Sequence, residues 1–327
     1  MISLRKFLFG ATAVATAFAV SASAGAADKP VYCVLLKTLS NPFWGAMEKG
    51  IKDGASAAGV EYFMQAVESD QAAEPQLNTC NTMLQRKPVV MITAAINSTI
   101  LLPCLKQAND AGIPVVDLDA NLDHAIAAKA GVKIAFTISS DNVAAGKQGA
   151  DWLAGKLGKD AKGPVLVIEG LPGNPTGQKR AQGFRDEIAK AAPGLKVVAS
   201  LPGDWDRQKA ANITNSTLTR NPDLVVIFCA NDTMALGAVE AAYAAGKGAQ
   251  ITIIGVDGNV DAVKSIKAGR LNASVAQLPY LVGKQAVEKA KAVVAGEKVD
   301  EYTYVPTLVL TKDVLEANKD PMLQYVK

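Results

Sequence analysis

The stretch PVYCVLLKTLSNPFWGAMEKGIKDGASAAG (residues 30–59) contains the unit from which the fold is built. An apolar run, residues 30–37, is followed by an Asn-Pro turn and an amphipathic segment, residues 43–58, that ends at Gly59. Short apolar runs are typical of buried strands, helical periodicity predicts a helix, and a glycine often follows the last helical turn. The stretch therefore predicts a β-α unit, with an amide and two large aromatic residues at its corner.

The same alternation fills the chain in two series. The first has apolar runs at residues 30–37, 59–67, 88–95, 113–120 and 134–140, and helical periodicity at 43–58, 73–85 and 100–111. The second has runs at 164–170, 195–201, 223–230, 251–258 and 271–277, with helices near 176–192, 206–220, 232–245 and 259–268. Alternating strands and helices predict an α/β fold of two doubly wound parallel-sheet lobes. A helix near 280–295 and a strand near 304–311 must be added to one or both lobes.

The bulk composition is that of a globular protein. The 327 residues are enough for two domains, and 49% of them are hydrophobic while 20% are charged. The net charge of +3 is small, and the lysines and arginines are scattered. This argues against nucleic acid or a membrane surface as the main partner.

Residues 1–26 have the pattern of a secretory signal peptide. Arg5 and Lys6 precede an apolar stretch, residues 7–20, and small residues follow as Ala22-Ser23-Ala24 and Ala24-Gly25-Ala26. An uncleaved membrane anchor is the alternative, but the apolar stretch is shorter than the roughly 20 residues that a span needs. We expect cleavage and a soluble protein outside the cytoplasm.

The four cysteines do not form a disulfide framework or a zinc motif. Cys33 and Cys229 lie in apolar runs and are expected to be small core residues. Cys80 and Cys104 lie on successive predicted helices, and an oxidising compartment would permit a disulfide between them. The sequence leaves both states of this pair open, because it does not give their distance.

Polar or aromatic side chains follow almost every predicted strand. They are Lys37, Asn41, Phe43, Trp44, Asp119, Glu169, Trp205, Asn231, Asp232, Asp257 and Gln277. In open α/β sheets, ligands bind outside the carboxyl ends of the strands. These residues therefore predict a ligand site at that edge.

Signatures of catalysis are missing from the sequence. The single histidine, His124, has no patterned nucleophile near it, and we expect it to be exposed in a loop. The glycine-rich stretch GLPGNPTG (170–177) is not a phosphate-binding motif and is interpreted as a turn. No cysteine, histidine or acidic cluster has metal-ligand spacing. The remaining amides, carboxylates and aromatics suit binding, with no cofactor or metal, better than bond breaking.

Six motifs, spread over nearly the whole chain after the signal peptide, resemble the motifs of a known protein family. They are TLSNPFW (38–44), SSDNVAAG (139–146), GDWDRQKA (203–210), CANDTMALGA (229–238), IIGVDG (253–258) and VAQLP (275–279). Together they resemble the periplasmic sugar-binding proteins of the ribose, allose and galactose type, the solute receptors of ABC importers. KTLSNPFW, GDWDR and the insert after Asp119 are nearer to the allose type than to the ribose type. The resemblance implies a receptor, not an enzyme, that closes two lobes around a sugar by a hinge motion.

In this family the sugar stacks on aromatic rings and is held by a ring of polar groups. The resemblance assigns ligand binding to Lys37, Asn41, Phe43, Trp44, Asp119, Arg180, Trp205, Asn231, Asp257 and Gln277. Aromatic faces suit the C–H faces of a pyranose, and carboxylate, amide and guanidinium groups suit its hydroxyls. Without the resemblance, Arg180 would be interpreted as a solvated surface charge. Asp232 is expected to cap the following helix and to leave Asn231 for the ligand.

One position departs from the family pattern. Ribose receptors have an arginine directly after the aspartate that Asp119 matches, whereas this chain has Ala120 followed by Asn121. The missing bidentate donor makes ribose a poor candidate. An allose-like hexose is favoured, and a ketohexose such as psicose or a polyol is the alternative.

The family's chain crosses between its lobes three times, here near residues 138–141, 276–279 and 305–309. We therefore expect an N-terminal lobe of residues 27–139 plus 278–307 and a C-terminal lobe of residues 140–277 plus 308–327.

The implied protein is a periplasmic monomer whose partners are an ABC import permease and, in addition, a chemoreceptor. A repressor effector domain shares this fold, but the chain has an export signal and no helix-turn-helix before the first lobe. An exported sugar-modifying enzyme is the other alternative, and turnover of a bound sugar would distinguish it.

Overall fold

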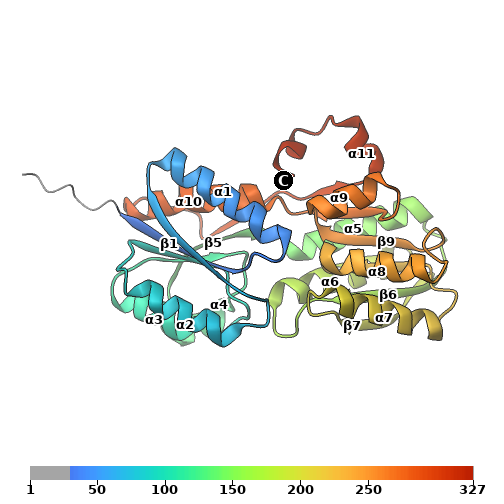
Figure 1. Cartoon of the computed structure of the whole chain (residues 1–327), viewed down its shortest axis with the longest axis horizontal. Coiled ribbons are helices and arrows are strands. Elements are labelled where there is room, and N and C mark those ends of the chain that lie inside the picture. Colours follow the sequence, from blue (N-terminus) through green and yellow to red (C-terminus); the bar gives the residue numbers. More distant parts are fainter. Residues whose placement is uncertain (1–29, 327) are drawn as a thin grey trace, which may run out of the picture.

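Two six-stranded sheets, placed end to end, form the framework of the computed structural model, which describes residues 30–326 (Figure 1). The first sheet has the order β11-β5-β4-β3-β1-β2, and all its strands are parallel. Its strands are β1 (Val31–Thr38), β2 (Glu61–Val67), β3 (Val90–Thr93), β4 (Val115–Leu118), β5 (Ile134–Ser140) and β11 (Tyr302–Val305).

The second sheet repeats this arrangement in the order β12-β10-β9-β8-β6-β7. Its strands are parallel except the edge strand β12, which is antiparallel to β10. They are β6 (Gly163–Glu169), β7 (Leu195–Pro202), β8 (Val226–Cys229), β9 (Thr252–Asp257), β10 (Ala273–Ala276) and β12 (Leu308–Leu310). The predicted fold class, an α/β protein with two doubly wound lobes, is confirmed.

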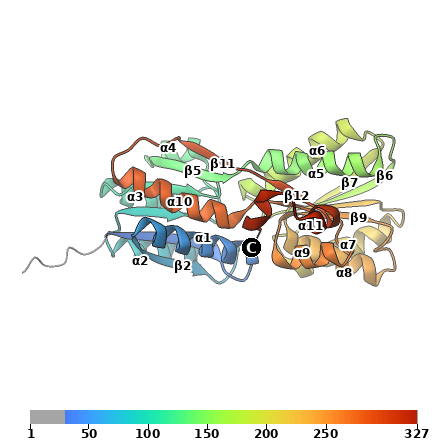
Figure 2. The ribbon, with the colours of Figure 1, turned by 90° about the horizontal axis from the view of Figure 1, so that it is seen from above.

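Helices cover both faces of each sheet (Figures 1 and 2). Around the first sheet are α1 (Pro42–Ala58), α2 (Ala73–Leu84), α3 (Leu102–Asp110), α4 (His124–Lys129) and α10 (Pro279–Val294). Around the second are α5 (Asn142–Leu157), α6 (Pro175–Ala191), α7 (Arg207–Arg220), α8 (Asp232–Ala244), α9 (Val260–Lys267) and α11 (Lys312–Ala317), and a 3-10 turn (Pro321–Tyr325) follows. Within residues 30–326, no helix combines the length and hydropathy needed to span a bilayer. The predicted signal peptide, residues 1–26, lies outside the described residues.

The predicted strand near 304–311 is wrong in one respect, because it is two strands. Pro306 and Thr307 separate β11 in the first sheet from β12 in the second. Proline has no N–H for a sheet ladder, so it marks the point at which the chain leaves one sheet for the other. The chain also passes between the sheets after β5 and after β10.

Helices α4 and α5 were not predicted from the sequence. In α5, small residues replace the large apolar residues that signal a helix, because α5 crosses α6 at very short range. A Cβ at Gly146 would lie 2.0 Å from the backbone oxygen of Arg180, so only glycine permits this approach. The crossing fixes the turn of α6 that carries Arg180.

The cysteines occupy the hydrophobic core. Cys33 and Cys229 are buried free thiols, as predicted. The structure joins Cys80 on α2 to Cys104 on α3 by a disulfide, the state that the sequence left open. The bridge ties together two of the helices that pack on one face of the first sheet.

Candidate functional site

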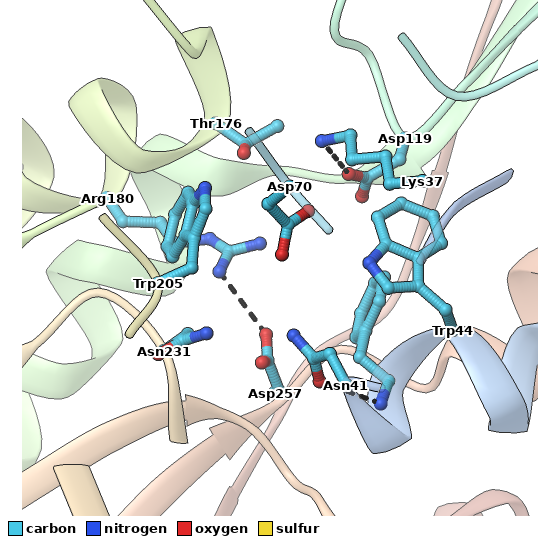
Figure 3. Close-up of a pocket in the computed structure, with 11 residues that line it drawn as sticks. Lys37, Asn41, Trp44, Asp70, Asp119, Thr176, Arg180, Trp205, Asn231 and Asp257 are labelled. Atoms are coloured by element: carbon cyan, nitrogen blue, oxygen red, sulfur yellow. Dashed lines mark hydrogen bonds and ion pairs between the residues drawn. The ribbon is translucent and has the colours of Figure 1, made fainter. Parts of the chain in front are cut away.

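The carboxyl ends of the strands in the two sheets face each other across a pocket (Figure 3). Nine of the predicted residues line it: Lys37, Asn41, Phe43, Trp44, Asp119, Arg180, Trp205, Asn231 and Asp257. Two further lining residues, Asp70 and Thr176, were missed from the sequence.

Aromatic rings lie on two sides of the pocket. Phe43 and Trp44, at the start of α1, form an edge-to-face pair with ring centroids 4.9 Å apart. Both also pack against the core and are only 4% and 3% exposed. Trp205 comes from the turn between β7 and α7 in the other lobe and faces the pocket from the opposite side (Figure 3). A flat ligand between these rings would be covered on both faces.

The glycine-rich stretch of residues 170–177 supports Trp205. A Cβ at Gly170 would lie 2.2 Å from the indole ring, and one at Gly177 would lie 2.8 Å from it. Real Cβ contacts are never so short, so both positions need glycine for the indole to lie flat against the backbone. Residues 170–174 form a turn, as predicted, while residues 175–177 begin α6, and the stretch also positions an aromatic residue of the pocket.

On the first lobe, Lys37 and Asp119 form a buried polar pair. The Lys37 Nζ donates to Asn121 Oδ1 at 2.9 Å and lies 3.9 Å from Asp119 Oδ2. Asn121 Nδ2 in turn donates to Asp119 Oδ2 at 3.0 Å. Burial lowers the pKa of Lys37 and raises the pKa of Asp119, and the attraction between the two charges partly offsets both effects.

On the second lobe, Arg180 is held in a fixed orientation. Its Nε donates to Asn142 Oδ1 at 2.8 Å, and its Nη1 donates to the Ala230 carbonyl at 2.8 Å and to Asp257 Oδ1 at 3.2 Å. Burial raises the pKa of Asp257 well above its usual value, and the Arg180 charge partly offsets the rise. Gln277 does not line the pocket; its Nε2 lies behind it, 3.5 Å from Asp257 Oδ1.

Asparagine side chains cap three helices whose N-termini point at the pocket. Asn41 Oδ1 accepts from Phe43 N, Asn174 Oδ1 accepts from Thr176 N, and Asn231 Oδ1 accepts from Met234 N. The amide nitrogens of Asn41 and Asn231 have no acceptor among residues 30–326, so both remain available to a ligand.

The predicted capping role of Asp232 was wrong. The cap of α8 is Asn231, whereas the Asp232 carboxylate is buried and accepts from Ser274 Oγ at 2.6 Å and Asn259 N at 2.8 Å. Asn231 therefore caps the helix with its oxygen and presents its nitrogen to the pocket.

Backbone strain is concentrated at this site. Asp119, Trp205 and Asp257 have φ values of 71°, 64° and 129°, in the region that favours glycine. Non-glycine residues are held there at a cost of about 1–3 kcal/mol each, and such residues cluster at functional sites. The strained backbone at these three residues indicates that the orientations of their side chains are maintained for function.

Hydrogen bonds join the two lobes around the pocket. Asn174 Nδ2, from the second lobe, donates to the Ile96 carbonyl at 3.0 Å and to Asn121 Oδ1 at 3.1 Å in the first. Gln71 Nε2 donates in the opposite direction to the Asp204 carbonyl at 3.1 Å. The structure is therefore a closed arrangement of the lobes.

The single histidine of the sequence, His124, lies outside this pocket. His124 is half-buried at the start of α4, where its Nε2 lies 3.0 Å from Thr137 Oγ1 and 3.3 Å from Asp117 Oδ2. The prediction of an exposed loop histidine was thus wrong, but His124 does not line the pocket. In the part of the chain that the structure describes, no group of three or more Cys, His, Asp or Glu residues could hold a metal.

Comparison with known proteins gives consistent matches. The family model for the periplasmic binding protein domain matches residues 31–298. The D-allose-binding periplasmic protein of Escherichia coli is 36% identical over 317 residues, which cover 94% of this chain and all of that protein. The ribose import binding protein of Salmonella typhimurium is 35% identical and covers 91% of this chain and 95% of its own length.

Solved structures agree with the sequence matches. An ABC transporter solute-binding protein from Actinobacillus succinogenes with bound D-allose has a TM-score of 0.83 and 32% identity, over 88% of this chain and 100% of that one. A second, from Agrobacterium vitis with bound α-D-tagatopyranose, has a TM-score of 0.83 and 29% identity, over 90% of this chain and 98% of that one.

Proposed function

Because the chain belongs to the periplasmic binding protein family, we propose that it is an extracytoplasmic receptor that binds a monosaccharide between its lobes and delivers it to an ABC import permease. The observation that carries this proposal is the composition of the closed pocket. Aromatic rings face each other across the pocket, and carboxylates, amides and cations surround its edge.

This composition matches the chemistry of a sugar. The C–H faces of a pyranose pack against π-faces, and its hydroxyls both donate and accept hydrogen bonds. Asp119 and Asp257 supply acceptors, whereas Lys37, Arg180 and the amide of Asn231 supply donors. In this scheme the side chain of Gln277 orients Asp257 by a hydrogen bond and is not part of the pocket lining.

The proposed cycle uses the two lobes as separate bodies. They comprise residues 27–139 plus 278–307 and residues 140–277 plus 308–327, and they open and close about the three crossings that follow β5, β10 and β11. The division is supported by the distribution of strands between the two sheets. The receptor acts as a monomer in the periplasm, and a chemoreceptor is its second partner.

An allose-like hexose is the favoured ligand, with psicose or a polyol as the alternative. Where ribose receptors carry an arginine, this chain has Ala120, and the neighbouring Asn121 instead bonds to Lys37 and Asp119. This part of the pocket therefore offers an ammonium, a single-point donor, in place of a planar bidentate donor.

A thermal-shift screen of the chain tests the proposal. The panel is D-allose, D-ribose, D-psicose, D-tagatose, D-fucose and myo-inositol. At a concentration of 100 to 1,000 times its dissociation constant, a cognate sugar stabilises the folded state by about 3–4 kcal/mol. The sugar should be recovered unchanged after incubation. No shift with any compound contradicts a sugar receptor, and conversion of the sugar contradicts a receptor without catalysis.

A further inference from the structure

Asp70 is the one acidic residue of the pocket that the sequence analysis did not identify. It lies in the loop between β2 and α2, and its carboxylate projects into the middle of the pocket (Figure 3). Within residues 30–326, the Asp70 carboxylate has neither a hydrogen-bond donor nor a salt-bridge partner. This sets it apart from Asp119, which pairs with Lys37, and from Asp257, which pairs with Arg180.

The ion pairs formed by the other charged residues of the pocket determine which ligand groups can bind beside Asp70. Its carboxylate only accepts hydrogen bonds when ionised, so a ligand must bring a donor to it. Lys37 is paired with Asp119 and Arg180 with Asp257, while burial raises the pKa of Asp70 and the nearby Lys37 charge offsets part of the rise. The lining thus holds three carboxylates against two cations, and an anionic ligand would meet uncompensated repulsion.

The loop that carries Asp70 also takes part in closure. The next residue, Gln71, donates across the cleft to the carbonyl of Asp204, which directly precedes Trp205. Thr38 Oγ1 donates to the Glu68 carbonyl at 3.1 Å and fixes the start of the loop to the end of β1. Asp70 is therefore held over the pocket in the closed arrangement by contacts on either side of it.

We propose that Asp70 is a further ligand-binding residue, whose carboxylate accepts a hydrogen bond from a hydroxyl of the bound sugar and restricts the receptor to neutral sugars. This inference rests on the proposed function and narrows its substrate class. Sugar acids and sugar phosphates are excluded, because the lining holds more carboxylates than cations and the anion would lie beside Asp70, which forms no salt bridge within residues 30–326.

Calorimetric titration of D-allose and its 2-, 3-, 4- and 6-deoxy derivatives into the wild type and Asp70→Asn tests the contact. If the panel above identifies another sugar, the deoxy derivatives of that sugar take their place. A hydrogen bond to a charged acceptor predicts that Asp70→Asn weakens binding of the parent sugar by about 10- to 100-fold. With the deoxy sugar that lacks the partner hydroxyl, the same substitution changes affinity by less than twofold.

The matched control is Glu68→Gln, which removes the same charge from an exposed position of the same loop and leaves affinity unchanged. Unchanged binding by Asp70→Asn overturns the proposal, as does an equal loss with every deoxy sugar, which would give Asp70 a structural role. Tight binding of D-ribose 5-phosphate or D-glucuronate to the wild type overturns the exclusion of anions. If the wild type binds no sugar at all, the proposed function fails, and this result is distinct from the other three.

Discussion

The substitution Asn174→Asp separates closure of the lobes from contact with the ligand. Asn174 is fully buried; its Oδ1 caps α6, and its Nδ2 makes two hydrogen bonds to the first lobe, at 3.0 Å to Ile96 and 3.1 Å to Asn121. Aspartate keeps the capping oxygen but replaces the donor with an acceptor. Two lost hydrogen bonds cost about 1–3 kcal/mol in the closed state alone, so the dissociation constant for the sugar should rise roughly 5- to 150-fold.

Isothermal titration of the cognate sugar measures this change, and small-angle scattering checks closure. The variant should show a larger radius of gyration than the wild type at the same sub-saturating sugar concentration. Asn215→Asp, the same substitution at an exposed position of α7, is the control and should bind like the wild type. Wild-type affinity and scattering in Asn174→Asp would refute a role for these bonds in closure.

Three further predictions concern the pocket and the core. Trp205→Ala should weaken sugar binding at least tenfold by titration. Trp44→Ala should also weaken binding and lower the free energy of unfolding by about 3–5 kcal/mol, because Trp44 is buried, whereas the loss of stability in Trp205→Ala should be smaller because Trp205 is only partly buried. Replacing Cys80 and Cys104 together by serine should lower the free energy of unfolding by about 3 kcal/mol in urea and leave sugar affinity unchanged, since the bridge closes a loop with a sequence separation of 24. Burial raises the pKa of Asp232 to about 7, so the folded state holds a proton between pH 4 and 7 that the unfolded state has released. The free energy of unfolding should therefore fall as pH rises through this range, by up to about 1.4 kcal/mol per pH unit, and Asp232→Asn should reduce the slope; equal slopes would contradict the assignment.

The central strands, such as β1, β3 and β8, could be predicted because they are continuous apolar runs buried between two helix layers. The stretch of residues 30–59 contains both signals, an apolar run and a helix that ends at Gly59 in the left-handed conformation. Helix α5 could not be found in this way. The face of α5 that contacts α6 has a glycine, Gly146, at the point of closest approach. Because the two backbones pack so closely, the sequence of α5 lacks the periodic large apolar residues that predict a helix.

Most of the pocket could be predicted because parallel strands bring their carboxyl ends together. Arg180 is different, since it lies in the second turn of a helix, and only the family resemblance singled it out. Asp70 was missed although a carboxylate shortly after a strand is the signal that identified Asp119. Asn174 was missed because the glycines around it indicated a turn, yet Asn174-Pro175 repeats the Asn-Pro helix start at Asn41.

A crystal structure of the chain with its cognate sugar tests the central claim most directly. One sugar ring should lie between Trp44 and Trp205, with hydroxyls within hydrogen-bond distance of Asp119, Arg180 and Asp257. An empty pocket at saturating sugar, or a sugar bound elsewhere on the surface, would contradict it.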